Sequence, residues 1–259
     1  MSAQRLRALS AAALLAAACS AADEGSPSGN VADAEGWNGL LSRHARDGGI
    51  AYSTLAGERA LLEEYLESVA AADPSALDPD QELAFWINAY NAGVASLVLD
   101  RYPGVESIKD VGGFFDELTF EVAGGPMTLD EVEGRARGSG DPRVHFAVVC
   151  ASASCPDLRG EAYVGDRLDE QLDEQTRSFL ADREKGLRFD PDGNELHLSS
   201  IFKWYAGDFT GGSTVVAFFA RGKVAAWVLD YLPGELAGAI RAADPDVRYL
   251  DYDWSLNDR

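Results

Sequence analysis

The chain has 259 residues, 43 of them acidic and 22 basic, which gives a formal net charge of −21 at pH 7. Such an acidic surface repels phosphate backbones and anionic lipid headgroups, so the composition argues against nucleic-acid binding. Behind an N-terminal leader, about 225 residues remain, enough for one substantial hydrophobic core and too few for two comfortable domains. We therefore expect a single globular domain over residues 37–259.

The N-terminus has the pattern of an export signal. Arg5 and Arg7 precede a short apolar run over residues 11–18. A membrane-spanning helix needs roughly 20 apolar residues, so a signal peptide over residues 1–18 fits this run better. Cys19 follows the run as in a bacterial lipoprotein signal, which predicts lipidation of Cys19. The alternative is ordinary cleavage after an Ala-x-Ala site.

Residues 19–36 are rich in small and polar residues, and we expect them to form a flexible tether. The protein would then be exported to the bacterial cell envelope, either anchored through Cys19 or free in the periplasm or medium. The only membrane contact that we expect is through the lipidated Cys19.

Helical periodicity and turn signals divide the remainder into elements. Helices are expected over residues 34–46, 55–71, 78–101, 129–137, 166–181, 199–207 and 214–231, hairpins over 120–129 and 187–198, a buried strand over 144–149, and a closing strand over 247–252. This order predicts an α+β fold: a helix-rich domain around a small, largely antiparallel sheet. A papain-like or transglutaminase-like core is one hypothesis for it, prompted by the occurrence of helix, strand, His and Cys.

The segment 144–156 is the most promising place for chemistry, because it reads as a strand running into a Ser/Cys turn. Strand alternation would place His145 and Cys150 on opposite faces, roughly 16 Å apart. A dyad between these two residues is therefore disfavoured. A Cys150 nucleophile would need His197 or His44 as its base.

Cys150 and Cys155 are the two cysteines of the body. In an exported protein such a pair predicts a disulfide, here around a very small loop. A zinc site with His145 lacks an evident fourth ligand, and we predict no metal and no cofactor. Ser152 and Ser154 lie within the same loop and are candidate ligand contacts.

Asn88 and Asn91 lie on a small-residue stripe of the expected helix over residues 78–101, which is apolar nearly all round and therefore buried. Buried amides need hydrogen-bond partners. They either tie the helix to a neighbouring loop or form a polar wall of a site. Near the C-terminal end of the domain, Lys203 and Asp208 either pair with each other or anchor a ligand carboxylate.

The spaced motifs together resemble the bacterial and plant family known as domain of unknown function 547. The resemblance covers roughly residues 37–257 and rests on residues 49–52, 85–94, 102–103, 107–108, 129–133, 141–147, 155–156, 158–159, 161–163, 198–199, 201–205 and 208–209. Ala51 departs from the pattern, where an acidic residue is expected. The family has no established activity, and the joining of some relatives to glutaredoxin-like modules hints at thiol chemistry.

Three functions stay open. The first is an envelope domain that binds a small molecule or a peptide- or glycan-like ligand at the Cys150–Cys155 loop. The second is a cysteine-dependent acyl-transfer or peptide-hydrolysing enzyme, and the third is a thiol–disulfide exchange protein. The candidate catalytic residues are Cys150, His145 and Cys155, and the candidate ligand-binding residues are Asn88, Asn91, Ser152, Ser154, Arg159, Lys203 and Asp208.

Overall fold

The computed structural model describes residues 34–211 and 217–259. Its α-helices are α1 Ala34–His44, α2 Tyr52–Leu55, α3 Arg59–Ala71, α4 Pro79–Leu99, α5 Leu129–Arg137, α6 Leu168–Ala181, α7 Ile201–Trp204, α8 Ala217–Leu229 and α9 Gly234–Ala243. Its strands are β1 Ala45–Arg46, β2 Gly49–Ile50, β3 Thr119–Val122, β4 Gly125–Thr128, β5 Leu187–Asp190, β6 Glu195–Leu198 and β7 Asp246–Tyr249. The expected helix-rich α+β class is confirmed.

The sheets are small and peripheral. β1 pairs with β2, and β3 with β4, as two-stranded antiparallel hairpins. The third sheet has the order β5-β6-β7, in which β5 and β6 are antiparallel and β7 joins β6 in parallel. No helix in the described part of the chain is long and apolar enough to cross a membrane.

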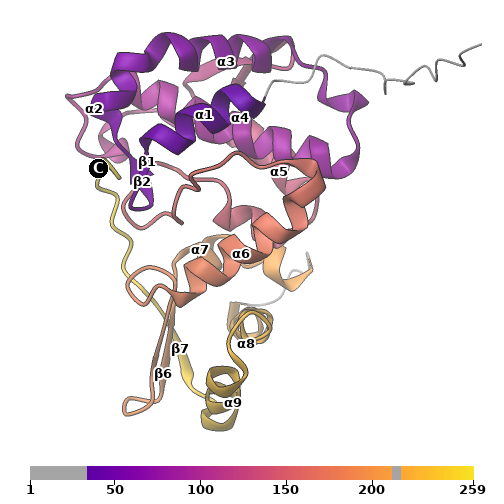
Figure 1. The fold of residues 1–259 in the computed structure, drawn as a ribbon. Coiled ribbons are helices and arrows are strands. Elements are labelled where there is room, and N and C mark those ends of the chain that lie inside the picture. The colour runs from indigo at the N-terminus through magenta and orange to yellow at the C-terminus, as the bar shows by residue number, and fades with distance from the viewer. Residues whose placement is uncertain (1–33, 212–216) are drawn as a thin grey trace, which may run out of the picture.

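Helix α4 is the central element of the upper part of the molecule, where α1 to α4 gather (Figure 1). It begins with a capping box, because the Asp78 side chain accepts from the backbone of Asp80 and Gln81 while Gln81 reaches back to the N-cap. All but one of its residues from Leu83 to Leu99 are buried. A helix that is apolar on nearly every face is stable only when other elements cover it.

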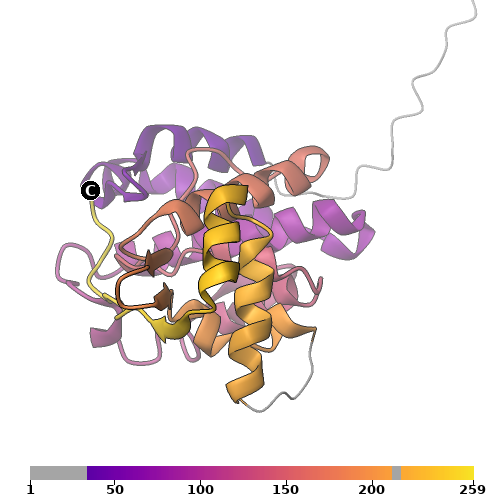
Figure 2. The same cartoon turned by 90° about the horizontal axis from the view of Figure 1, so that it is seen from below.

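A second core lies in the lower part of the molecule, where the β5-β6-β7 sheet meets α8 and α9 (Figures 1 and 2). Phe146 belongs to this core, whereas its neighbours Val144 and Ala147 belong to the core around α4. The segment around residue 145 therefore joins the two cores. The C-terminus returns to the upper part, where the amide of Arg259 donates to the carbonyl of Ile50 at 3.0 Å.

The expected strand over residues 144–149 is wrong. Residues Pro142–Phe146 form a 3-10 helix instead, capped by the Asp141 side chain, which accepts from Arg143 N at 2.9 Å. The chain beyond it pairs with a side chain rather than with a strand: Asn91 donates to the carbonyl of Ala147 at 2.9 Å and accepts from the amide of Val149 at 2.8 Å.

Other elements differ from expectation in their bounds. The expected helix over 55–71 is interrupted by a 3-10 turn, and the one over 199–207 is reduced to α7. The closing strand is β7, which starts and ends earlier than expected, and α9 and the β1–β2 hairpin were not expected. Part of the expected helix over 214–231, the signal segment 1–18 and Cys19 lie outside the described residues.

Candidate functional site

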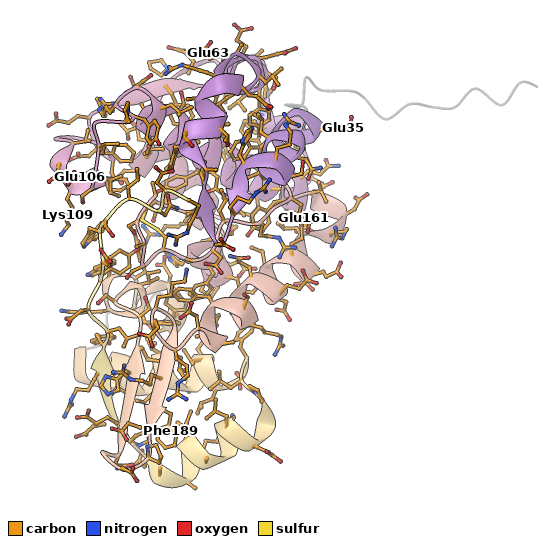
Figure 3. The ribbon with its side chains drawn as sticks, turned by 60° about the vertical axis from the view of Figure 1, so that its left-hand side comes forward. Glu35, Glu63, Glu106, Lys109, Glu161 and Phe189 are labelled. Carbon is orange, nitrogen blue, oxygen red and sulfur yellow. A yellow bond between two sulfur atoms is a disulfide. The ribbon has the colours of Figure 1, made fainter. Side chains whose placement is uncertain are left out.

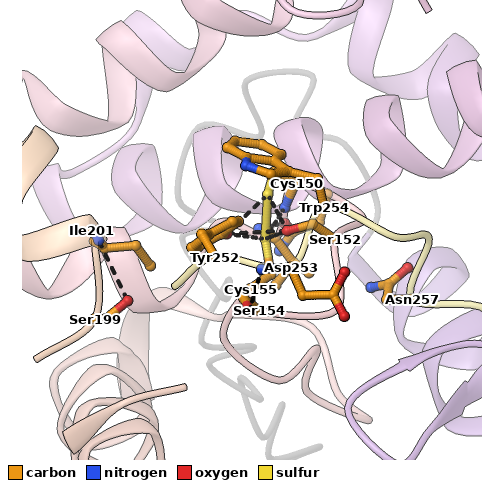
Figure 4. The surroundings of a disulfide bond; sticks show 12 residues. Cys150, Ser152, Ser154, Cys155, Ser199, Ile201, Tyr252, Asp253, Trp254 and Asn257 are labelled. Atoms are coloured by element: carbon orange, nitrogen blue, oxygen red, sulfur yellow. Dashed lines mark hydrogen bonds between the residues drawn. A yellow bond between two sulfur atoms is a disulfide. The ribbon is translucent and has the colours of Figure 1, made fainter. Parts of the chain in front are cut away.

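Cys150 and Cys155 form a disulfide with their Cα atoms 6.3 Å apart, which confirms the predicted pairing (Figure 4). The loop between them is tight, and Ala151 adopts a left-handed conformation with φ of 63°. Ser152 lies at its centre, with its hydroxyl 3.2 Å from the sulfur of Cys150 and 3.1 Å from the hydroxyl of Tyr252.

The C-terminal segment holds this loop from outside. The amide of Ala153 donates to the carbonyl of Ser255 at 2.8 Å, and the amide of Ser154 donates to the carbonyl of Asp253 at 3.1 Å. In return, the amide of Asp253 donates to the hydroxyl of Ser154 at 2.9 Å. The disulfide loop is therefore fixed by hydrogen bonds to a segment that lies about 100 residues later in the chain.

A cavity of about 140 Å³ opens beside the disulfide. Its lining comes from α4, α5, the segment around residue 145, the disulfide loop, α7 and the C-terminal segment. The lining residues are Tyr90, Phe115, Asp130, Glu133, His145, Val148, Cys150, Cys155, Pro156, Ile201, Trp204, Tyr205 and Trp254. His145 and Cys150 thus both line this cavity, while the imidazole of His145 pairs with Asp208 rather than with Cys150.

Glu133 is the most deeply buried carboxyl group of the cavity, with 8% of the residue exposed. Burial raises its pKa, although a hydrogen bond with Tyr205 and the positive charge of Arg137 act in the opposite direction. Burial also raises the pKa of Asp130, one turn earlier on α5, and the charge of Asp116 adds to this shift. Both carboxyl groups therefore hold protons more strongly than they would in water.

His145 forms a dyad with Asp208, in which Nε2 and Oδ2 are 2.8 Å apart. Burial lowers the pKa of His145 to about 4 and outweighs the charge and the hydrogen bond of Asp208. The imidazole is thus neutral at pH 7, with its Nε2 hydrogen directed to Asp208. Burial would raise the pKa of Asp208, but hydrogen bonds from Arg137 and His145 lower it. The ring of Tyr205 covers the imidazole, with centroids 4.0 Å apart.

Three mutually tilted aromatic rings, those of Trp204, Tyr252 and Trp254, gather at the cavity, and Trp204 and Trp254 line it. Trp204 is 48% exposed, and its ring lies 4.8 Å from that of Tyr252 and 5.6 Å from that of Trp254. The ammonium group of Lys109 lies 4.5 Å from the centre of the Trp254 ring. We call Trp204, Tyr252 and Trp254 the aromatic platform. Flat, partly exposed rings of this kind supply large contact areas for ligands.

The predicted amides lie behind the site rather than in it. Asn88 donates to the carbonyl of Tyr163 at 2.8 Å and accepts from its amide at 3.0 Å. Asn91 holds the backbone of Ala147 and Val149 in the same manner. Neither asparagine lines the cavity. Their hydrogen bonds fit the interpretation that they tie α4 to neighbouring loops.

The other predicted residues are spread over the molecule. Asp208 pairs with Arg137 and His145, and no ion pair joins it to Lys203 in the described structure. Arg159 pairs with Glu161 and Glu174 away from the cavity lining.

The two remaining histidines also lie elsewhere. His44 contacts Thr54, and His197 lies 3.2 Å from Glu195. Among the described residues, no group of three or more His, Cys, Asp or Glu side chains is arranged to hold a metal ion.

Sequence reasoning missed Glu133, Tyr205 and the aromatic platform as parts of the site. In the aromatic run over residues 201–209, Phe202 and Phe209 are buried in the core, whereas Trp204 is 48% exposed. The exposure of a tryptophan cannot be read from its neighbours in a four-residue helix. Glu133 belongs to one of the motifs behind the family resemblance, which by itself assigns it no role.

Residues 74–180 match the model of a protein family described as "Protein of unknown function, DUF547". The match confirms the family resemblance for the segment that contains α4, α5, His145 and the disulfide loop. Asp208 and the aromatic platform lie beyond the matched residues. No curated protein and no solved structure matches the chain.

Proposed function

We propose that the protein is an exported domain of the bacterial cell envelope that binds a peptide- or glycan-like ligand in the cavity beside the Cys150–Cys155 disulfide. The observation that carries this proposal is the meeting of an exposed ring, Trp204, with a buried carboxyl group, Glu133, in one cavity. Ligand sites in proteins combine apolar walls with a few polar groups that fix orientation. At about 140 Å³ the cavity is smaller than the roughly 300–1,000 Å³ of sites that enclose a whole small molecule, so it takes one side chain or sugar unit while the rest of the ligand lies over the exposed Trp204.

Each part of the cavity has a task in such binding. The aromatic platform offers ring faces on which the apolar face of a sugar or a peptide side chain stacks. The Glu133 carboxyl group, held by Tyr205, exchanges hydrogen bonds with hydroxyl or amide groups of the ligand. The disulfide fixes one wall before the ligand arrives, which lowers the entropic cost of binding.

The proposal is tested by isothermal titration of the protein with a panel of short peptides and oligosaccharides. Trp204→Ala should weaken the binding of a positive ligand by about tenfold or more, because it removes the exposed ring. Leu61→Ala is the matched control, since Leu61 is similarly exposed, at 46%, but lies on α3. Equal affinity of the wild type and Trp204→Ala would contradict the proposal, as would a panel without any binder.

Export and lipid anchoring at Cys19 form a separate part of the proposal. They are supported by the N-terminal signal pattern and by the disulfide, since disulfides persist mainly in oxidising compartments. Expression in a bacterial host with labelled palmitate should give a labelled, membrane-bound protein. Cys19→Ala should remove both the label and the membrane association. A wild-type protein that stays unlabelled and in the cytoplasm would contradict this part.

A thiol-dependent acyl transfer is the second candidate function. It is favoured by one observation, the shared cavity of His145 and Cys150. The disulfide occupies both sulfur atoms, so this activity requires prior reduction of the pair. The reduced protein should then turn over an amide or ester probe, and Cys150→Ala should abolish the turnover. Turnover that survives in both Cys150→Ala and Cys155→Ala would rule this candidate out.

Thiol–disulfide exchange is the third candidate. Cys150 is partly exposed at the cavity while Cys155 is buried, an asymmetry that leaves one sulfur open to attack. Equilibration with glutathione buffers should give the pair a reduction potential within the range of thiol–disulfide exchange enzymes. A pair that stays oxidised in excess reduced glutathione would exclude this function.

A further inference from the structure

A second, larger hollow lies in the part of the molecule that contains β5, away from the disulfide. It has a volume of about 780 Å³, within the roughly 300–1,000 Å³ of small-molecule sites. We call it the β5 groove. Figure 3 labels one of its residues, Phe189, at the opposite end of the molecule from Glu63. The lining residues are Arg177, Leu180, Ala181, Arg183, Leu187, Phe189, Pro191, Tyr231, Leu232, Pro233 and Leu236.

The walls of the β5 groove are apolar and come from three elements. Leu180 lies at the end of α6, Phe189 on the edge strand β5, and Leu236 in the first turn of α9. Phe189 and Leu236 are only partly buried. The groove therefore offers uncovered apolar surface to a ligand rather than a closed core.

The charge of the β5 groove is opposite to that of the whole chain. Among the described residues that line it, the charged ones are Arg177 and Arg183 and none is Asp or Glu, although the chain has 43 acidic and 22 basic residues. The cavity beside the disulfide has the reverse character, with Asp130 and Glu133 and no Lys or Arg in its lining. The two sites thus suit ligands of different charge.

The two arginines differ in how they are held. Arg177 donates to the carbonyl of Tyr231 at 3.1 Å, lies 3.4 Å from Asp173 and covers the Tyr231 ring. Arg183 is exposed, and no ion pair engages it within the described residues. Its guanidinium group is therefore available to an anion, and guanidinium groups match carboxylates with two parallel hydrogen bonds.

Two helix ends adjoin the β5 groove and act in opposite senses. Helix α9 begins at Gly234 without a side-chain cap, so its first amides carry partial positive charge beside Pro233. The carboxyl end of α6 carries partial negative charge, which the arginines offset. The attraction of arginines to this helix end explains why they lie near α6. It does not explain the exposed apolar surface beside the arginines.

We propose that the β5 groove binds a free single-chain fatty acid, with the acyl chain between β5 and α9 and the carboxylate on Arg183. The apolar wall accounts for the acyl chain of the ligand, and Arg183, which no ion pair engages within the described residues, accounts for its single anionic headgroup. A neutral chain would leave the guanidinium group unused. A cationic amphiphile would meet Arg177 and Arg183 and be repelled.

The test is calorimetric titration of the full chain with dodecanoate below its micelle concentration, beside dodecanol as the neutral probe of equal length. Dodecanoate should bind more tightly than dodecanol. Arg183→Gln should weaken dodecanoate binding by about fivefold, the size expected for an exposed charge pair, and leave dodecanol binding unchanged. Arg183→Lys should restore part of the loss. Arg188→Gln is the matched control, because Arg188 lies on β5 next to Phe189 but does not line the groove.

A substitution in the apolar wall tests the chain position. Leu236→Asp should abolish the binding of both probes, while circular dichroism shows that the fold is kept. Equal binding of dodecanoate to the wild type and to Arg183→Gln would overturn the proposal, as would an absence of dodecanoate binding. If dodecanoate does not bind and Leu236→Asp instead converts a dimer into a monomer, the groove is an interface between two copies and the proposal is wrong.

Discussion

His145 and Asp208 lie 63 residues apart in the chain, yet Nε2 of the imidazole is 2.8 Å from Oδ2 of the carboxylate. Arg137 reaches the same oxygen from α5 at 2.8 Å. The carboxylate is thus shared between a guanidinium group and an imidazole. The guanidinium charge is permanent, and the buried imidazole is neutral because its pKa is lowered to about 4.

This arrangement predicts a loss of stability in acid. The pKa of His145 is about 4 in the folded protein against 6.5 for a free side chain. Between these two values the unfolded chain binds a proton that the folded protein does not. The free energy of unfolding should therefore fall as the pH decreases from 6.5 to 4, by up to about 1.4 kcal/mol per pH unit from this group.

Urea denaturation of the wild type and of His145→Gln, between pH 7 and pH 4.5, measures this contribution. Carboxyl groups with raised pKa values, Glu133 and Asp130, oppose the trend, whereas the lowered pKa of Asp208 takes effect mainly below this pH range. The difference between the two proteins isolates His145, provided that His197→Gln behaves like the wild type. A difference that does not change with pH would contradict the prediction.

Asn91 and Asn88 form matched pairs of hydrogen bonds with different consequences for the site. Removal of either side chain leaves one backbone amide and one carbonyl without a partner. Asn91→Ala and Asn88→Ala should each lower the free energy of unfolding by about 2–4 kcal/mol. Asn91 fixes the backbone that leads into Cys150, whereas Asn88 fixes Tyr163, which is not part of the cavity lining.

The two variants should therefore differ in ligand binding. At a temperature where both are folded, Asn91→Ala should weaken ligand binding in the cavity beside the disulfide, and Asn88→Ala should not. Titration with the best ligand from the panel distinguishes them. Equal affinities would mean that the backbone around Ala147 does not position the cavity wall.

The Cys150–Cys155 disulfide should be complete in the native protein and modest in its effect on stability. In a Cys19→Ser background, thiol titration should find no free thiol before reduction and two after it. A loop of this size restricts the unfolded chain only slightly, so replacement of both cysteines by alanine should cost about 2 kcal/mol. Free thiols in the native protein would contradict the pairing. A much larger loss of stability would show that the bridge also holds native packing.

The sequence predicted local features better than contacts between distant segments. Helices α3, α4 and α6 were predicted because helical spacing and capping signals act within a few residues. The run around His145 was misassigned because its apolar, β-branched residues are typical of strands. Its backbone partner is the side chain of Asn91, 56 to 58 residues earlier in the chain. A partner that distant leaves no local signal.

Helix α9 and the aromatic platform escaped prediction for related reasons. Gly234 and Gly238 lower the helix propensity of α9, which packs through Ala237 and Ile240 against the second core. The aromatic platform joins Trp204 to two residues about 50 positions later. The disulfide was predictable, since two cysteines close together in a chain that carries an export-signal pattern have few alternatives.

At Gly93 on α4, helix propensity and side-chain packing have opposite effects on the free energy of unfolding. Glycine in a helix interior costs about 1 kcal/mol relative to alanine, so Gly93→Ala should be stabilising on propensity alone. A Cβ atom at Gly93, however, would lie 2.7 Å from Cε1 of the Phe120 ring. Overpacking of this kind costs about 1–3 kcal/mol, so we expect Gly93→Ala to be destabilising by up to about 2 kcal/mol.

The partner ring and a second helical glycine supply the controls for this prediction. In a Phe120→Ala background the clash is absent, and Gly93→Ala should become stabilising. Gly134→Ala on α5 should stabilise the wild type by up to about 1 kcal/mol, because nothing lies within 4 Å of a Cβ atom there. Denaturation curves of the four variants measure both terms. A stabilising Gly93→Ala in the wild-type background would show that the β3–β4 hairpin carrying Phe120 moves away from α4 at little cost.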